Sequence, residues 1–349
     1  MKIVTIVGAR PQFIKAATVS RVIKSYQEIR EVIVHTGQHY DKNMSEVFFT
    51  ELAIPEPNIN LEVGSGLHGK QTARMLEGIE GVLIAEKPDW VLVYGDTNST
   101  VAGALAAAKL NIPIAHVEAG LRSFNRTMPE EINRIATDHI SSCLFVPTQN
   151  AMNLLEKEGL TDKAIFSGDV MYDSILHYKE IASSRVSLKN MTELASGKYF
   201  LATIHRQENT DDIENLRKIF TAFSKLDLPV ILPMHPRTRK YMNEISNKSN
   251  VVIIDPVGYL EMITLLGNCH KVLTDSGGLQ KEAFFLKKPC VTLREETEWI
   301  ETLEGNWNFV TGTNPQKILE KISVNQFGEQ KQFFGDGKAA EKIVEYLLR

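Results

Sequence analysis

The stretch KIVTIVGARP, residues 2–11, decides the fold class of this chain. Its first part is rich in Ile and Val, which favour a strand, and Gly8 then permits a tight turn. Pro11 suits the first turn of a helix, where its missing N–H leaves no hydrogen bond unmade. A strand that runs through a glycine turn into a helix is typical of the βαβ units of a parallel sheet.

The same alternation of strand and helix continues along the chain. Short apolar runs predict strands, which in the first half are Lys2–Val7, Val32–His35, Trp90–Tyr94, Ile112–Val117 and Leu144–Val146. Helical patterns lie between them, for example at Gln12–Ser25, Gly69–Glu86 and Thr97–Leu110. The strands predicted in the second half are Tyr199–Ile204, Val230–Met234, Val251–Ile254, Lys271–Thr274 and Cys290–Leu293. Apolar strands alternating with helices indicate parallel sheets covered by helices on both faces.

Two such series of strands predict two domains, which agrees with a length of 349 residues. We expect an α/β fold with two Rossmann-like domains facing a central cleft, divided into residues 1–175 and 176–349. The apolar spacing of Gly337–Leu348 predicts a closing amphipathic helix, for which packing back on the N-terminal domain is an option.

The composition excludes several classes of protein. Hydrophobic residues make up 43% of the chain and charged residues 23%, and the net charge of -4 comes without the basic stripe of a nucleic-acid-binding protein. No apolar stretch approaches the ~18 residues of a membrane helix, and the N-terminus does not resemble a signal peptide. The cysteines Cys143, Cys269 and Cys290 are odd in number and far apart, so we expect free thiols in a reducing cytoplasm.

Polar residues that directly follow a strand are the first candidates for a site, because open parallel sheets bind ligands beyond the carboxyl ends of their strands. Arg10 and Lys15 lie near the start of the first helix, a favourable place for an anion, although a plain turn with a solvated Arg is the alternative. Asp96 also follows a strand, but taken alone it is more simply interpreted as a helix N-cap. Glu118 ends the strand in HVEAG, where a buried carboxylate is costly without a partner or a function.

The segment after that strand holds further charged candidates. Arg122 and Arg134 lie on either side of Glu130, whose alternative role is in a capping box formed by the TMPE pattern. The spacings of Glu131, Arg134 and Asp138 allow these side chains to pair on one face of a helix.

The second half offers two candidate groups. His205 follows a strand in HRQEN, and an imidazole there suits proton transfer or contact with phosphate, with a structural role as an equal alternative. Ser276, Gly277 and Gly278 form a turn between a strand and a helix, and small residues there expose backbone N–H groups to phosphate. A mere turn is the alternative. Glu282 lies further along that helix, where it could accept hydrogen bonds from ribose hydroxyls.

Cofactor and metal motifs are weak or missing. Residues 64–69, GSGLHG, match the GxGxxG pattern, but the alternating segment before them is unlike a central first strand, so NAD binding is disfavoured. The sequence contains no Walker lysine loop, HExxH or GxSxG motif, and His35 and His39 stand at a strand end and not on a helix. We therefore predict no obligatory metal.

Seven segments, in order, identify a family resemblance. They are GARPQFIK, GDTNST, HVEAGLRS, MPEEINR, HRQEN, DPVGYLE and TDSGGLQKEA, and together they resemble the non-hydrolysing UDP-N-acetylglucosamine 2-epimerases over essentially the whole chain. The resemblance implies a glycosyltransferase-B-like fold, a homodimer, and an isomerase without an added cofactor. Such enzymes invert C2 of a UDP-linked N-acetylated sugar by eliminating UDP to a 2-acetamidoglucal and adding it back.

The resemblance also implies roles for individual residues. It makes the N-terminal domain the carrier of the catalytic carboxylates and the C-terminal domain the UDP-binding one. The catalytic residues would be Asp96, Glu118, Glu130 and His205. The residues predicted to bind UDP or the rest of the substrate are Arg10, Lys15, Arg122, Arg134, His205, Ser276, Gly277, Gly278 and Glu282.

Two departures from the common family pattern bear on the sugar. Gln12 stands where members acting on UDP-N-acetylglucosamine typically carry Glu, and Thr297–Glu301 reads TEWIE in place of a TERPE segment. These forms resemble the subgroup acting on UDP-2,3-diacetamido-2,3-dideoxyglucuronate, which serves O-antigen and other surface-polysaccharide synthesis. We favour that substrate slightly over UDP-N-acetylglucosamine. The alternative functions are a glycosyltransferase using a UDP-sugar donor and, less favoured, an NAD-dependent oxidoreductase.

Overall fold

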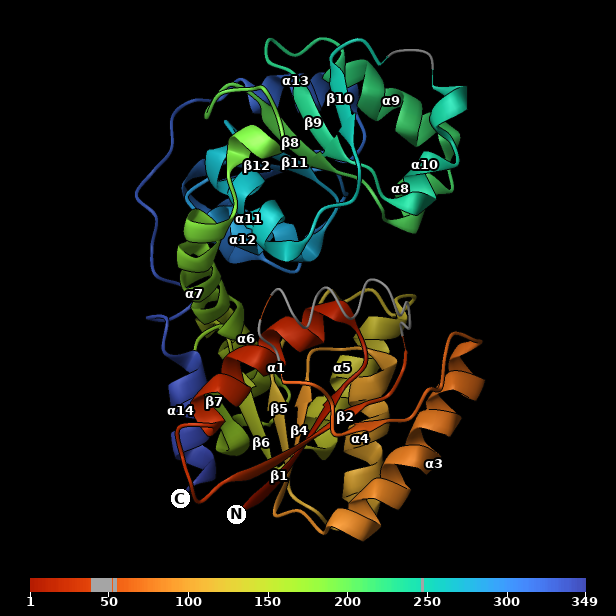
Figure 1. The fold of residues 1–349 in the computed structure, drawn as a ribbon, viewed down its shortest axis with the longest axis vertical. Helices are drawn as coiled ribbons and strands as arrows, with labels where there is room; N and C mark the ends of the chain where they lie inside the picture. The colour runs from red at the N-terminus through yellow and green to blue at the C-terminus, as the bar shows by residue number, and fades with distance from the viewer. Residues whose placement is uncertain (39–51, 53–54, 246–247) are drawn as a thin grey trace. The chain divides into compact units, whose positions relative to one another are not determined.

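The computed structural model describes residues 1–38, 52, 55–245 and 248–349, so His39 lies outside the described residues. The chain divides into two compact units (Figure 1). Unit 1 comprises Met1–Leu176 and Gln332–Arg349, and unit 2 comprises His177–Lys331. A search of the described helices finds none with the length and apolar character needed to span a membrane.

Unit 1 is built on a parallel sheet of seven described strands in the order β3-β2-β1-β4-β5-β6-β7. These strands are β1 (Lys2–Val7), β2 (Arg30–His35), β3 (Ile59–Asn60), β4 (Trp90–Tyr94), β5 (Ile114–Val117), β6 (Cys143–Val146) and β7 (Ala164–Phe166). β1 pairs with β2 on one side and with β4 on the other, so the sheet is wound in both directions from β1. This order creates a topological switch point between β1 and β4, where ligands of such sheets bind.

Helices lie on both faces of this sheet (Figure 1). They are α1 (Arg10–Ile23), α3 (His68–Glu86), α4 (Asn98–Lys109), α5 (Pro129–Ile140), α6 (Gln149–Lys157), the start of α7 (Val170–Arg185), and α14 (Ala339–Leu347), with the short helix η1 (Thr161–Lys163). The C-terminal α14 packs against α1, so both ends of the chain belong to unit 1.

Unit 2 repeats the architecture with six described parallel strands in the order β10-β9-β8-β11-β12-β13. They are β8 (Phe200–Thr203), β9 (Val230–Pro233), β10 (Val251–Ile254), β11 (Val272–Thr274), β12 (Cys290–Thr292) and β13 (Asn308–Val310). The helices are α8 (Gln207–Thr210), α9 (Ile213–Phe223), α10 (Pro236–Arg239), α11 (Tyr259–Asn268), α12 (Gly277–Phe285) and α13 (Pro315–Ile322), with η2 (Leu188–Asn190), η3 (Met242–Glu244) and η4 (Ile300–Asn306). The switch point of unit 2 lies between β8 and β11.

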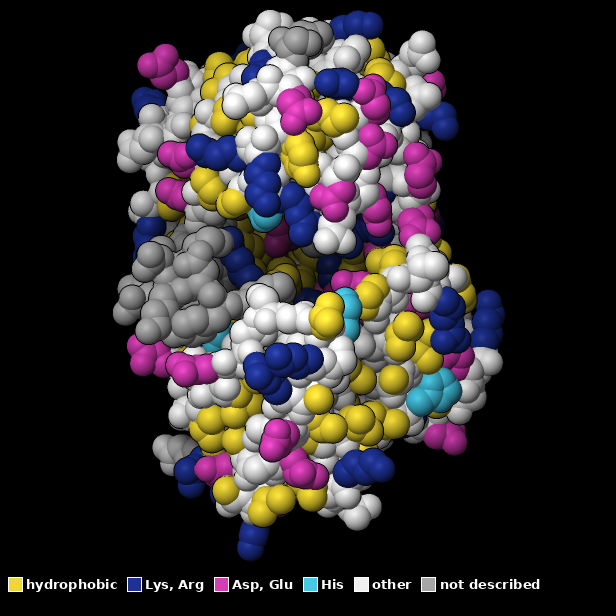
Figure 2. All heavy atoms as spheres, turned by 90° about the vertical axis from the view of Figure 1, so that its right-hand side faces the viewer, with side chains coloured by type: hydrophobic (Ala, Val, Ile, Leu, Met, Phe, Trp, Pro, Cys, Tyr) yellow, Lys and Arg dark blue, Asp and Glu magenta, His cyan; other side chains and the backbone are white. Residues whose placement is uncertain are grey.

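The predicted α/β class with two parallel sheets is confirmed, and each predicted strand lies within two residues of its observed limits. β7 and β13, which were not predicted, are three-residue strands at sheet edges. The cores are apolar, and Val4, Ile6, Val91 and Val93 are fully buried between β1, β4 and the helices. On the face that Figure 2 shows, basic and acidic side chains are interspersed, in keeping with the balanced composition.

The turn after β1 is tightly packed, which gives a test of the fold. A Cβ at Gly8 would lie 2.0 Å from Ser99 Oγ and 2.3 Å from Thr36 Oγ1. We expect Gly8→Ala to lower the free energy of unfolding by about 1–3 kcal/mol, measured by urea denaturation. Gly81→Ala is the control, because Gly81 lies in α3 with nothing within 4 Å of an added Cβ, and it should stabilise by ~0.5–1 kcal/mol. Equal stability of the Gly8 variant and the parent would contradict this packing.

Candidate active site

The switch point of unit 1 brings predicted site residues together. β1, β4 and β5 are neighbours in the sheet, so the turns that leave their carboxyl ends lie side by side. Arg10 follows β1 as the exposed first residue of α1, Asp96 follows β4, and Glu118 follows β5. Lys15, one turn further along α1, is buried and its Nζ forms an ion pair with Glu118 Oε2. Lys15 therefore belongs to the carboxylate cluster of this unit.

Glu118 has an unusual backbone conformation. Its φ of +69° lies in the left-handed region, which non-glycine residues seldom occupy and which costs of order 1–3 kcal/mol. Its side chain is nearly buried, with 6% exposed, and faces the ammonium group of Lys15. A Cβ at Gly95 would lie only 3.5 Å from Glu118 Oε2, so the turn after β4 packs directly against this ion pair. A strained, buried carboxylate at a strand end is what a functional site requires.

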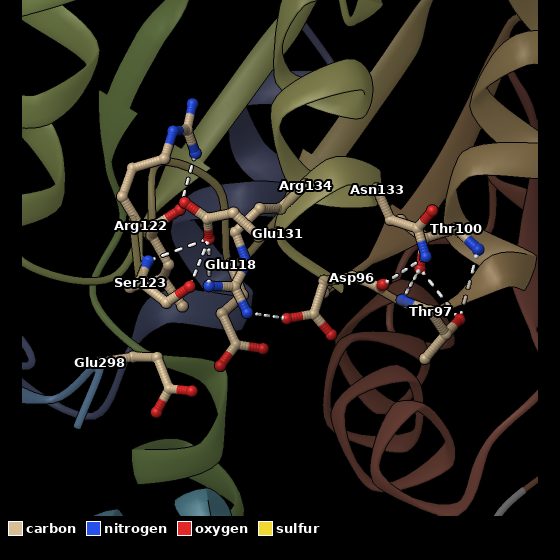
Figure 3. Close-up of polar contacts among 12 residues, drawn as sticks. Asp96, Thr97, Thr100, Glu118, Arg122, Ser123, Glu131, Asn133, Arg134 and Glu298 are labelled. Carbon is tan, nitrogen blue, oxygen red and sulfur yellow. Dashed lines mark hydrogen bonds and ion pairs between the residues drawn. The ribbon is translucent and has the colours of Figure 1, made fainter. Parts of the chain in front are cut away.

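Asp96 is not the N-cap of α4. That position belongs to Thr97, whose side chain accepts a hydrogen bond from Thr100 N–H. The Asp96 carboxylate instead forms an ion pair with Arg134 of α5 (Figure 3). The Asp96 side chain is 31% exposed, whereas that of Arg134 is 6% exposed, so Arg134 holds Asp96 while one side of the carboxylate stays accessible.

The start of α5 differs from the capping-box alternative. The N-cap is Met128, and Thr127 Oγ1 donates to Asn125 Oδ1, so the TMPE pattern forms no capping box. Glu130 is half-buried in the first turn of α5, and its carboxylate has no hydrogen-bond partner among the described residues. The next residue, Glu131, is buried and accepts hydrogen bonds from Ser123, Phe124 and Arg134 (Figure 3). Glu131 therefore orders the loop through hydrogen bonds that Glu130 does not share.

Arg122 does not fit the predicted role in binding substrate. Its side chain is 2% exposed, and its guanidinium donates to Asp138, to both carboxylate oxygens of Glu158 and to the Leu121 carbonyl. These contacts use four of the five N–H donors of an Arg side chain. Arg122 therefore stabilises the loop after β5 from inside, and its direct contact with a ligand is not supported.

The switch point of unit 2 holds His205 and Asp275. His205 follows β8, and Asp275 follows the neighbouring β11. The buried Asp275 carboxylate accepts hydrogen bonds from the backbone N–H groups of His205 and Arg206, and its Oδ1 lies 3.3 Å from His205 Nδ1. Burial lowers the pKa of His205, Asp275 acts in the opposite direction, and Arg206 and Arg237 add to the lowering. The His205 side chain is 37% exposed, so its imidazole is accessible from solvent.

Helix α12 begins shortly after β11, so its N-terminus follows Asp275 directly in the sequence. Ser276 is the N-cap, and Gly277 and Gly278 form the first turn, so their backbone N–H groups are free of side-chain crowding. A Cβ at Gly277 would lie 3.7 Å from Trp299 Nε1 and 3.8 Å from Arg294 Nη1. Glu298 Oε2 would also lie 3.8 Å away, and the Glu298 carboxylate is paired with the Arg294 guanidinium. The backbone N–H groups of the first turn are therefore what this helix end offers to an anion. Glu282 is buried on the same helix.

Asp275 and Arg294 were missed as site residues by the sequence reasoning. Asp275 directly follows a predicted strand, as Asp96 does, so the strand-end rule could have identified it. From the sequence, only the phosphate-binding potential of the turn that begins at Ser276 was considered. Arg294 follows the predicted strand Cys290–Leu293 in the same way. Among the described residues, no group of three or more His, Cys, Asp or Glu side chains is arranged to hold a metal ion.

Comparison with known proteins adds independent evidence. The family model described as UDP-N-acetylglucosamine 2-epimerase matches residues 21–348. The chain belongs to the UDP-N-acetylglucosamine 2-epimerase family. Within this family, it is 57% identical to a UDP-N-acetylglucosamine 2-epimerase homolog of Methanococcus maripaludis, over 99% of each chain. It is also 51% identical to the UDP-2,3-diacetamido-2,3-dideoxy-D-glucuronate 2-epimerase of Pseudomonas aeruginosa, over the whole of each chain. The resemblance inferred from the seven segments is thus confirmed.

Solved structures agree with this family membership. The Methanocaldococcus jannaschii UDP-GlcNAc 2-epimerase, solved in complex with UDP-GlcNAc and UDP, has a TM-score of 0.92 and 45% identity, covering 100% of this chain and 99% of that one. The glycosyltransferase SnogD from Streptomyces nogalater has a TM-score of 0.58 at 12% identity, with 99% of this chain and 100% of that one covered. At that identity the likeness extends to the fold alone. The epimerase fold of this chain is therefore also that of a glycosyltransferase.

Proposed function

We propose that the protein is a non-hydrolysing 2-epimerase of a UDP-activated N-acetylated sugar, an isomerase that interconverts the gluco and manno forms at C2. The observation that carries the proposal is the carboxylate cluster of unit 1. Asp96 and Glu118 leave adjacent strands at the switch point, each with a cationic partner, Arg134 or Lys15. Glu130 adds a third acid at the start of α5.

The chemistry requires acids on both faces of one carbon. A carboxylate removes the proton from C2, the C1–O bond to UDP breaks, and the bonding electrons leave with the UDP oxygen, which gives a 2-acetamidoglucal. In the second half, the UDP oxygen re-forms the bond to C1 while C2 takes a proton on the opposite face. A weakly acidic C–H needs a base in a preorganised and dry site, and the fixed Lys15–Glu118 pair offers such a group.

We further propose that unit 2 binds UDP. The backbone N–H groups of Gly277 and Gly278, at the N-terminus of α12, suit the diphosphate of the leaving UDP. His205, held by Asp275, is suited to contact the same charge. Glu282, further along α12, is suited to accept hydrogen bonds from the ribose hydroxyls of UDP. If unit 2 binds UDP and unit 1 carries out the chemistry at C2, both switch points have a function: the acidic one of unit 1 and the one of unit 2 that is rich in N–H donors.

For the sugar, we propose UDP-2,3-diacetamido-2,3-dideoxyglucuronate, with UDP-N-acetylglucosamine as the alternative. Identity to the Pseudomonas aeruginosa enzyme is 51% and to the Methanocaldococcus jannaschii enzyme 45%, but the 57% identical Methanococcus maripaludis relative is named for UDP-N-acetylglucosamine, so the choice depends on the two sequence departures. Of the two sequence departures, Gln12 is 1% exposed and uses its amide on Gly8, Ala9, Tyr94 and Thr100, so it orders the turns after β1 and β4 without reaching a sugar. Trp299, beside the α12 N-terminus, is the departure suited to act on specificity.

An NMR assay in D2O with each candidate sugar nucleotide tests the reaction and the substrate together. We expect deuterium at C2 and formation of the manno product, with the larger kcat/KM for the 2,3-diacetamido glucuronate. Faster turnover of UDP-N-acetylglucosamine would reverse the choice of substrate. Lack of C2 exchange with both compounds would exclude an epimerase.

The same assay separates the competing functions. A glycosyltransferase would transfer the sugar to an acceptor without exchange of the C2 hydrogen. An oxidoreductase would need NAD at residues 64–69, but these follow β3, a two-residue edge strand, and not the central β1. NAD is therefore expected to leave the thermal midpoint unchanged, whereas UDP should raise it.

We also propose a cytoplasmic homodimer that serves O-antigen or other surface-polysaccharide synthesis. The three cysteines are free and buried, which suits a reducing compartment. The family resemblance supports the dimer and the pathway class. Light scattering of the purified protein tests the dimer, and a monomeric mass across the working concentration range would refute it.

A further inference from the structure

His116 is a fully buried histidine with both ring nitrogens facing acceptors. It lies in β5, two residues before Glu118. Its Nδ1 is 2.7 Å from Asp138 Oδ1, and its Nε2 is 2.7 Å from the carbonyl oxygen of Gly95. A neutral imidazole has one N–H donor and one lone pair, so one of these short contacts would set a lone pair against an oxygen. With Asp138 ionised, both contacts are satisfied by an imidazolium that donates twice.

Asp138 supplies the negative charge that compensates the imidazolium, and it also contacts residues other than His116. Its Oδ2 accepts from the backbone N–H of Gly120 at 3.2 Å and from Arg122 Nη1 at 2.7 Å. Burial opposes ionisation of Asp138, but the hydrogen bond and charge of His116, together with Arg122, outweigh it and lower the Asp138 pKa. The carboxylate is therefore ionised and shared among three donors.

These contacts join the two turns that carry the predicted catalytic carboxylates. On one side, the His116 ring holds the Gly95 carbonyl, immediately before Asp96. On the other, Asp138 holds the N–H of Gly120, whose φ is +82°, two residues after the strained Glu118. A single buried pair, His116–Asp138, thus reaches from the turn after β4 to the turn after β5.

We propose that the His116 imidazolium and Asp138 are positioning residues that set the placement of Asp96 and Glu118 relative to each other. The proposal rests on the proposed epimerase function for its kinetic part. Misplacement of reacting groups by about 1 Å can cost ~10²-fold in rate, so loss of one of these contacts should reduce kcat far more than substrate binding.

Two substitutions of His116 separate the contacts. The amide of His116→Gln reaches the place of Nε2 and can still donate to Gly95, whereas the amide of His116→Asn reaches the place of Nδ1 and keeps only Asp138. We expect kcat of His116→Asn to lie at least ~10-fold below that of His116→Gln, with KM and UDP affinity within ~3-fold in both. Asp138→Asn turns an NH2 group toward the N–H donors of Gly120 or His116, and should lose ~10²-fold in kcat.

Asp162→Asn is the control matched to Asp138→Asn, because Asp162 is an exposed residue of η1 outside both turns, and it should retain kcat. A purely structural role would lower the melting temperature of both His116 variants and leave their kcat values equal. Equal kcat values in folded protein would overturn the positioning role.

The protonation state has its own readout. ¹⁵N NMR of the ring should show two protonated nitrogens for His116 in the intact enzyme, and one unprotonated nitrogen would overturn the imidazolium. This measurement needs no turnover, so it distinguishes failure of this proposal from failure of the epimerase function, which the D2O assay on the parent enzyme tests alone.

Discussion

Glu118→Gln is expected to reduce kcat for formation of the inverted epimer by at least ~10²-fold, measured by NMR at saturating UDP-sugar, if this carboxylate transfers the C2 proton. Gln keeps the size of the side chain but cannot accept a proton at this site. It also leaves the Lys15 ammonium without its anionic partner in a nearly buried position. UDP is proposed to bind unit 2, so its stabilisation of the protein in thermal melts should be unchanged.

The control for this change is Glu80→Gln. Glu80 lies on the exposed side of α3, so the same chemical substitution there should leave both turnover and melting temperature unchanged. A Glu118→Gln enzyme that turns over at near the parent rate would assign Glu118 to holding Lys15 and would remove it from the proton-transfer step. A loss of the UDP-induced shift would instead point to a folding defect.

Most of the fold could be predicted because strands that are buried on both faces appear in the sequence as continuous apolar runs. The runs at Lys2–Val7 and Trp90–Tyr94 are apolar on both faces, as a central parallel strand must be, and both were placed with their observed limits. β7 and β13 were not predicted, because each is a partly exposed edge strand of three residues, too short to give a long apolar run. Their existence depends on a neighbouring strand that offers hydrogen bonds.

The candidate site was predictable in position but not in its partners. The rule of strand ends located Asp96, Glu118 and His205, since it needs only the strands. It did not predict that Arg134 would pair with Asp96, because that contact joins residues 38 positions apart across two elements. Arg122 was predicted to bind the substrate, and the sequence does not show that its side chain is buried. Its burial depends on Asp138 and Glu158, whose closeness only the fold creates.

Asp96→Asn should lower the rate at which one C2 epimer is converted into the other by at least ~10²-fold if Asp96 is an acid–base group. Asn can still accept a hydrogen bond from Arg134, so the geometry of the turn after β4 is retained while the capacity to carry a proton is lost. Since Thr97, not Asp96, caps α4, the helix itself should keep its stability. The melting temperature of the variant should therefore stay close to that of the parent.

Asp89→Asn makes the matched control, because Asp89 is an exposed carboxylate at the opposite end of β4, where it accepts a hydrogen bond from Lys2 N–H. This variant should keep full turnover, whereas near-normal turnover of Asp96→Asn would leave Asp96 with only its ion pair.

The partial reactions of the two variants show which acid acts on which face of C2. If Asp96 and Glu118 serve opposite faces of C2, each variant should still exchange deuterium into one epimer while failing to form the other. Loss of exchange into both epimers in both variants would mean that the two carboxylates act on the same proton.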